Sequence, residues 1–176
     1  LSSRSAKGET LSEKETRTWG GERGLALPVL EKRLTRETDA LSPENPLVIA
    51  AGLLNGLAFS GTCRYGVYAK SPLTGALGES EAGGTFGPAM RAQGVDAIVL
   101  ESASEKPVYL WVENGTVTVH DAADLWGKTN RETFEILSSR HGRVSALLIG
   151  PAGERLVRYA CVINDLRHAN GRTGLG

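Results

Sequence analysis

Residues 64–70 read RYGVYAK, and the aromatic and β-branched residues in this run are typical of a β-strand. The run follows a shorter apolar stretch, residues 47–52 (LVIAAG), and leads into a glycine-rich stretch at residues 75–87. Glycines next to strands allow tight backbone turns and the close approach of a ligand. This part of the chain therefore predicts two strands followed by a glycine-rich loop.

The same order recurs further along the chain. Residues 146–151 (ALLIGP) precede residues 158–164 (RYACVIN), which lead into the glycine-rich residues 171–176. Duplicated halves usually pack about a pseudo-twofold axis, so we expect both Arg-Tyr strands and both glycine-rich loops to meet at one surface. Such a surface suits a large, roughly two-fold symmetric ligand with phosphates, which arginine forks and glycine N–H groups bind well. A coincidence between two amphipathic strands explains the repeat equally well.

The most definite local prediction is a hairpin at residues 108–120. There Asn114-Gly115 separates two runs rich in strand-forming residues, and both turn positions favour positive φ. We predict strands at residues 47–51, 64–70, 95–101, 108–113, 116–120, 144–149 and 158–163. We predict helices at residues 12–19, 26–34, 87–92 and 129–141. The expected fold class is α+β: two similar, mainly antiparallel β-sheets related by a pseudo-twofold axis, with a few short helices.

Length and charge exclude several classes of protein. With 176 residues the chain can bury one sizeable core without disulfides or metal. Lysine plus arginine equal aspartate plus glutamate, at 20 each, so no overall field favours nucleic acid or an anionic membrane. The apolar runs are too short to span a bilayer, and the start lacks a signal-peptide pattern. We therefore expect a cytoplasmic protein without nucleic-acid or membrane partners.

The cysteines and tryptophans are interpreted as packing residues. Cys63 and Cys161 are far apart, and no Cys-x-x-Cys pair indicates zinc or an iron–sulfur cluster. Free cysteine is often a small buried residue. We likewise expect Trp19, Trp111 and Trp126 to pack in the core.

Short sequence blocks connect the chain to a known family. They lie at residues 42–47 (SPENPL), 70–75 (KSPLTG), 83–87 (GGTFG), 105–110 (EKPVYL), 125–128 (LWGK), 149–154 (IGPAGE), 164–165 (ND) and 171–176 (GRTGLG). In this order they resemble the N-terminal, pterin-cofactor-binding domain of the tungsten-containing aldehyde:ferredoxin oxidoreductase family. We accordingly interpret residues 1–176 as one such domain, from a longer chain whose iron–sulfur and substrate domains lie outside it.

The resemblance implies a specific chemistry. In this family the N-terminal domain is a base of two β-sheets that carries a tungsto- or molybdo-bis-pterin cofactor, whose metal is held by dithiolene sulfurs. Mg²⁺ bridges the pterin phosphates, and a [4Fe–4S] cluster is bound by cysteines of later domains. The complete enzymes oxidise aldehydes to carboxylic acids and pass electrons to ferredoxin, so the isolated fragment should be inactive. Expected partners are ferredoxin, an aldehyde substrate, the missing C-terminal domains and a second copy in a homodimer.

The resemblance also assigns site residues. Arg64 matches an arginine that contacts the cofactor, although a strand-edge salt bridge is its ordinary role. Glu81, Ala82 and Gly83 match a loop whose backbone faces a pterin phosphate, and Glu81 stands where the family commonly has asparagine. Its backbone carbonyl can still bind Mg²⁺, whereas an added carboxylate would repel phosphate unless it is paired or turned away.

The second half contributes a corresponding set. His168 and Ala169 match an Arg-Ala pair, with the Ala169 carbonyl as the other Mg²⁺ ligand, and Arg158 and Arg172 are further candidates for phosphate contact. Histidine at this position makes cofactor affinity lower or dependent on pH. Taken alone, His168 could also be a metal ligand or a general base, but a lone loop histidine is more often only solvated.

Two alternative functions remain open. The chain could be a non-catalytic module that binds a phosphate-bearing cofactor, or part of the catalytic subunit of a benzoyl-CoA reductase-like complex, which resembles these enzymes in this domain. Dinucleotide binding is disfavoured, because no G-x-G-x-x-G sequence follows a first strand and opens a helix.

Overall fold

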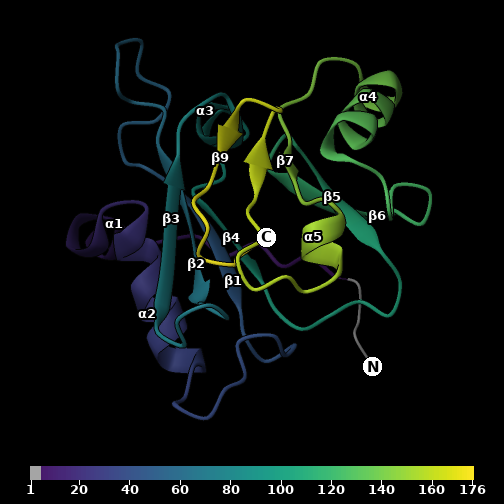
Figure 1. Cartoon of the computed structure of the whole chain (residues 1–176). Helices are drawn as coiled ribbons and strands as arrows, with labels where there is room; N and C mark the ends of the chain where they lie inside the picture. Colours follow the sequence, from purple (N-terminus) through teal and green to yellow (C-terminus); the bar gives the residue numbers. More distant parts are fainter. Residues whose placement is uncertain (1–4) are drawn as a thin grey trace.

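The central element of the fold is a four-stranded antiparallel sheet (Figure 1). The structure is a computed structural model that describes residues 5–176. The sheet contains β1 (Leu47–Ala51), β2 (Tyr65–Lys70), β3 (Leu77–Ala82) and β4 (Ala97–Leu100), in the order β3-β2-β1-β4. Ala51 pairs with Tyr65, and Tyr65 pairs with Ala82. The end of β1, the start of β2 and the end of β3 therefore lie at the same end of the sheet.

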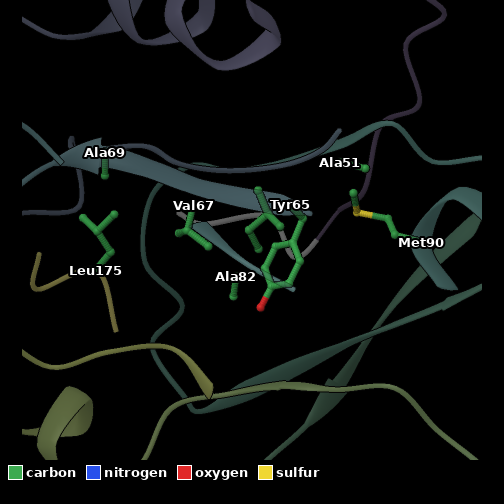
Figure 2. Packing of buried hydrophobic residues seen from close by; sticks show 8 residues of the cluster. Ala51, Tyr65, Val67, Ala69, Ala82, Met90 and Leu175 are labelled. Carbon is green, nitrogen blue, oxygen red and sulfur yellow. The ribbon is translucent and has the colours of Figure 1, made fainter. Parts of the chain in front are cut away.

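Both faces of this sheet are covered. On one face Tyr65 and Val67 pack with Met90 and with Leu175 from the end of the chain (Figure 2). On the other face Tyr68 packs, with its neighbours on β1, against the helix that precedes the sheet. Because successive side chains of a strand point to opposite faces, a strand between two cores must be apolar throughout. This is why polar and apolar residues do not alternate along the run RYGVYAK.

Three helices flank the sheet. The first two are α1 (Glu13–Trp19) and α2 (Arg23–Arg33), and the third is α3 (Phe86–Ala92). The predicted capping box is present, because the Ser12 side chain accepts from the Glu15 N–H and the Glu15 carboxylate accepts from the Ser12 N–H. Helix α2 begins three residues earlier than predicted, and Pro28 lies inside it. Burial of Ala26 and Leu30 against the sheet outweighs the cost of that proline.

The middle of the chain confirms the predicted hairpin. Strands β5 (Val108–Glu113) and β6 (Thr116–Asp121) are antiparallel, and Asn114 and Gly115 both have positive φ in the turn. Helix α4 (Asn130–His141) follows, with the predicted capping box at Thr129 and its end at Gly142. A separate core joins this region to the next strand through Leu125, Leu137 and Leu148.

The last part of the chain differs most from the prediction. It contains β7 (Leu147–Leu148), α5 (Pro151–Glu154), β8 (Ile163–Asn164) and β9 (His168–Ala169), in a sheet of order β7-β8-β9. The predicted strand at residues 158–163 is wrong except at its end. Local turns form instead, in which the Val157 N–H donates to the Ala152 carbonyl and the Ala160 N–H to the Val157 carbonyl. Backbone groups used in these turns cannot pair with a neighbouring strand.

Two other predictions need correction. Strand β3 was not predicted, because the sequence LGESEA is polar, yet Gly78, Ser80 and Ala82 alternate inward against the end of the chain. Trp19 and Trp126 do not pack in the core, since 49% and 53% of their surfaces are exposed. Trp111 is half-buried and stacks on His141, with a ring separation of 4.1 Å. Across residues 5–176 no helix has both the length and the apolar character needed to cross a membrane.

The C-terminal residues are bonded to the first sheet. The Tyr65 hydroxyl donates to Asn170 Oδ1 at 2.8 Å, and Asn170 Nδ2 donates to the Ser80 carbonyl at 2.8 Å. Ser71 Oγ also donates to the Thr173 carbonyl at 2.6 Å. Tyr65 and Asn170 are almost fully buried, so these bonds form out of contact with water. They join residues that are 105 positions apart.

We expect Tyr65→Phe to destabilise the chain by about 1–3 kcal/mol, because it leaves Asn170 Oδ1 buried without its donor. The measurement is urea unfolding of the purified chain. Tyr159→Phe is the control, since Tyr159 is exposed and its loss should change stability by no more than about 0.5 kcal/mol. Equal effects of the two substitutions would show that the buried bond contributes little.

Candidate functional site

The predicted site residues of both halves meet near one end of the central sheet. Arg64 immediately precedes β2, and its Nη2 lies 3.2 Å from Glu81 Oε2 on β3. The chain then turns through Gly83 and Gly84 beside β9. A Cβ added at Gly84 would lie 2.7 Å from His168 Cδ2 and would collide with the Asn164 side chain. Glycine is therefore required for the first glycine-rich loop to touch the second half.

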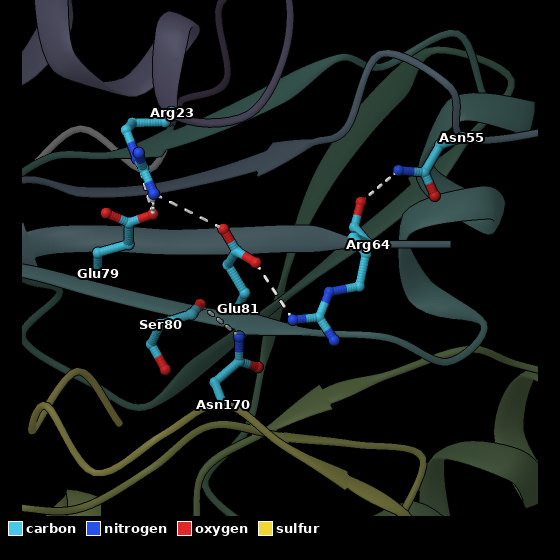
Figure 3. A network of polar contacts seen from close by, with 7 residues as sticks. All are labelled: Arg23, Asn55, Arg64, Glu79, Ser80, Glu81 and Asn170. Atoms are coloured by element: carbon cyan, nitrogen blue, oxygen red, sulfur yellow. Dashed lines mark hydrogen bonds and ion pairs between the residues drawn. The ribbon is translucent and has the colours of Figure 1, made fainter. Parts of the chain in front are cut away.

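The backbone of Arg64 is fixed while its side chain remains accessible. Its carbonyl accepts from the Gly52 N–H at 3.0 Å and from Asn55 Nδ2 (Figure 3). Its side chain is 54% exposed. Asn55 was not singled out from the sequence, and its only signal is an asparagine between glycines in a loop. This arrangement gives a positioned arginine that can still contact a ligand.

The Glu81 carboxylate is paired and turned away, so it does not repel a phosphate as an unpaired carboxylate would. Its side chain lies on the opposite face of β3 from Ser80, which contacts Asn170 (Figure 3). The carboxylate pairs with Arg64 and lies 3.9 Å from Arg23 Nη2, while Arg23 Nε donates to Glu79 Oε1 at 2.8 Å. The negative charge is thus paired with guanidinium groups on the α2 side of the sheet. A phosphate beside Gly83 would not meet an unpaired carboxylate.

Glu22 is a half-buried acid behind this network, with its Oε1 atom out of contact with solvent. Burial raises the pKa of its carboxyl above the ordinary value, and the nearby Glu81 raises it further, whereas Arg64 opposes the rise. Among the described residues, no hydrogen-bond partner is found for the buried Oε1 of Glu22. Its charged form is therefore destabilised in the folded protein.

A turn in the second half ties the two halves together. Asp165 and Leu166 have positive φ between β8 and β9. The Asp165 carboxylate accepts from the Ala146 N–H at 2.7 Å, from Ser145 Oγ at 3.0 Å and from the Thr85 hydroxyl. Thr85 is the N-cap residue of α3, so this carboxylate connects the first glycine-rich loop to β7. In the sequence, Asn164-Asp165 is one of the blocks shared with the family, and its role in joining the halves depends on tertiary contacts.

The remaining predicted residues divide into two groups. His168 and Ala169 are exposed on β9, Gly83 is half-buried, and Ala82 is buried in the sheet beside Tyr65. Arg172 is exposed in the terminal loop and has no ion pair among the described residues. Arg158 is not part of this group, because its Nη1 donates to the Pro72 carbonyl at 3.5 Å, beyond the opposite end of β2 from Arg64.

Comparison with known proteins identifies the family. The family described as aldehyde ferredoxin oxidoreductase, N-terminal domain, matches residues 1–176. Tungsten-containing aldehyde ferredoxin oxidoreductases from Pyrococcus furiosus and Thermococcus kodakarensis are 42% and 41% identical to the chain over 178 residues. In both cases the match covers 100% of this chain and 29% of the relative.

A solved structure adds a second kind of relative. The active-site complex BamBC of benzoyl coenzyme A reductase, in complex with 1,5-dienoyl-CoA, has a TM-score of 0.90 and 34% sequence identity. The similarity covers 95% of this chain and 26% of that chain. All of these relatives are oxidoreductases or parts of one. The chain belongs to the aldehyde ferredoxin oxidoreductase family, as its N-terminal domain.

We expect Glu22→Gln to have a larger free energy of unfolding than the unsubstituted chain at pH values above the raised pKa of Glu22. At acidic pH the two chains should be equally stable. Below the ordinary carboxyl pKa, Glu22 is protonated in both the folded and the unfolded state and has no such penalty. As pH rises through the raised pKa, the folded state must ionise a half-buried group, so the original chain loses stability relative to the glutamine variant. Thermal unfolding between pH 4 and pH 8 measures this gap.

The control is Glu31→Gln, which removes one negative charge from an exposed position on α2. A difference in stability between Glu22→Gln and the original chain that stays constant over the whole pH range would contradict the assignment of a half-buried carboxyl with a raised pKa.

Proposed function

We propose that this chain is the cofactor-binding domain of a longer oxidoreductase that oxidises aldehydes to carboxylic acids and delivers electrons to ferredoxin. The observation that carries the proposal is the surface formed by Arg64, the glycines at 83–84 and His168, in a chain that matches the family over its whole length. The cofactor proposed for this surface is a tungsto- or molybdo-bis-pterin with Mg²⁺.

The residues present fit such a group. The Arg64 guanidinium is exposed and its backbone is held, which suits charge-assisted contact with phosphate or pterin oxygens. Gly83 has only Cys63 Sγ close to its open side, at 3.4 Å from an added Cβ, so its backbone can be approached closely, whereas the Asn164 and His168 side chains fill that space at Gly84. The Asn164 side chain, fully buried beside Gly84, has an Oδ1 atom for which the described residues provide no hydrogen-bond donor. The Glu81 carboxylate is paired on the other face of β3.

Each residue has a proposed role. Arg64 would bind phosphate or pterin oxygens, Ala82 and Gly83 would present backbone to a phosphate, and the carbonyls of Glu81 and Ala169 would be Mg²⁺ ligands. His168 and Arg172 provide further hydrogen-bond donors from the second half. When bound, the cofactor would supply two-electron redox chemistry, with a [4Fe–4S] cluster in other domains as the proposed acceptor of its electrons.

Strand order supports a duplicated fold. The order β3-β2-β1 in the first half corresponds to β9-β8-β7 in the second, and a helix precedes β1 and β7 in each case. The second set is reduced to strands of two residues. We propose that the halves are related by a pseudo-twofold axis that passes near the contact of Gly84 with His168.

A second candidate function is favoured by one observation, the similarity to benzoyl coenzyme A reductase. In that case the same surface would bind the same class of cofactor, while the substrate would be an aromatic thioester. Assays of the full-length protein with aldehydes and with benzoyl-CoA separate these possibilities. A non-catalytic cofactor-binding module would be inactive in both assays.

We also propose that the full-length protein is cytoplasmic and forms a homodimer.

We expect Arg64→Ala to lower tungsten or molybdenum content in the full-length protein, purified without oxygen. Loss of a charge-assisted contact of roughly 1.5–3 kcal/mol corresponds to a decrease in cofactor affinity of about ten-fold or more. Metal analysis and pterin fluorescence measure the effect. Arg131→Ala is the matched control, because Arg131 is an exposed arginine on α4, away from the proposed surface.

Glu81→Gln separates the side chain from the backbone at this position. It keeps the carbonyl and removes the carboxylate that pairs with Arg64, so metal content should be retained or should increase. Normal cofactor retention in Arg64→Ala would remove Arg64 from the site.

We expect the 176-residue chain, produced alone, to carry no pterin or metal. It offers an exposed surface, and the cofactor would dissociate without the domains that bury its other side. Fluorescence of the denatured extract is the measurement, with the full-length protein as the positive control. Tightly bound pterin in the isolated chain would show that one surface is sufficient.

A further inference from the structure

The loop between β1 and β2 displays a group of apolar side chains to solvent. Leu53, Leu54, Leu57 and Phe59 are between 50% and 61% exposed. We call residues 53–59 the apolar loop. Single exposed apolar residues are common on protein surfaces, whereas four large ones within seven positions indicate a contact surface.

The apolar loop is a structured element. Its polar residue, Asn55, is buried and donates through Nδ2 to the Gly52 carbonyl at 3.2 Å and to the Arg64 carbonyl. Thr62 Oγ1 lies 2.9 Å from the Leu57 carbonyl and 2.8 Å from the Phe59 carbonyl. Asparagine and threonine thus hold the loop from inside while leucine and phenylalanine point outward. This is the reverse of the usual arrangement for a free surface loop.

The position of the apolar loop relates it to the candidate site. In Figure 1 it projects beyond the end of the sheet at which β1 ends and β3 ends. Arg64 follows two residues after Thr62, and Asn55 bonds directly to the Arg64 backbone. A protein domain that covers the exposed Arg64 guanidinium would therefore also contact the apolar loop.

We propose that the apolar loop is the docking surface for the later domains of the full-length chain, which close over the Arg64 surface. The proposal rests on the proposed function. Relatives that match the whole of this chain have only 29% of their length in the match, so most of such a protein lies elsewhere. A redox cofactor resting on Arg64 must be enclosed on its other side to exclude water, and the enclosing domain would bury the neighbouring leucines and phenylalanine.

The test compares two cysteine substitutions in the full-length protein. Leu57→Cys lies in the apolar loop, and Leu73→Cys lies in the turn after β2, where the leucine is similarly exposed at 48%. A water-soluble maleimide is added under native conditions, and modification is followed by mass spectrometry of the corresponding peptides. We expect Leu57→Cys to react at least about ten-fold more slowly than Leu73→Cys, because a docked domain must open before the thiol is reached. Both should react equally fast in denaturant.

Three outcomes decide the proposal. Equal native rates at the two positions would overturn it, and so would protection of Leu57→Cys that disappears on dilution to monomer, which would indicate a second copy as the occupant. Protection that is independent of concentration supports docking within one chain. If Leu57→Cys disturbs folding, hydrogen–deuterium exchange of the peptide 53–60 in the unsubstituted full-length protein gives the same comparison, and fast exchange there would overturn the proposal.

Metal content measured on the same samples separates this inference from the proposed function. A protected loop in a protein without tungsten or molybdenum would contradict the proposed function alone. A reactive loop in a protein with its full metal content would contradict only the docking surface.

Discussion

The hydrogen bonds from Asn170 to Tyr65 and Ser80 are the contacts on which the arrangement of the candidate site depends. They hold the C-terminal residues against the face of β2 and β3 that also buries Leu175. Because Tyr65, Asn170 and Ser80 are all buried, these bonds are shielded from water and are costly to break. Together with the bonds of Asp165, they position β9 and its exposed His168 and Ala169 beside Gly84. The polar contact and the apolar core therefore act together to make one surface from two distant parts of the chain.

The same sheet separates two electrostatic environments. On the α2 side, Arg23 is paired with Glu79 and the half-buried Glu22 lies behind the carboxylates, while Arg64, at the end of the sheet, pairs with Glu81. On the other side lie the uncharged Ser80 and Ala82, facing the C-terminal residues. Since alternate residues of β3 point to opposite faces, the glutamate at position 81 can be accommodated by turning away from the glycines that follow it. Its Arg64 partner remains half exposed, which makes Arg64 both a structural ion-pair partner and a candidate ligand-binding residue.

Local signals predicted the first half and the middle of the chain well. The capping boxes at Ser12 and Thr129 and the turn at Asn114-Gly115 involve residues within a few positions of each other, so their geometry is set before tertiary contacts form. The failures have a common cause. The sequence of β3 is polar, yet it forms a strand because it pairs with β2. Residues 158–162 have strand-forming side chains, yet they form turns after α5. Propensity was outweighed by tertiary context at both places.

By itself, the sequence determined the family, the α+β class, the capped starts of α1 and α4 and the hairpin, and it indicated Arg64 and the residues at 81–83 and 168–169 as a set. Only the tertiary structure decided that Glu81 pairs with Arg64, that Arg158 lies elsewhere, that Asp165 joins the halves and that the apolar loop stands exposed beside the site. The physical reason is sequence separation. Caps and turns are specified by neighbouring residues, whereas the partner of a charge and the burial of a side chain depend on segments brought together only by folding, as Tyr65 and Asn170 are across 105 positions.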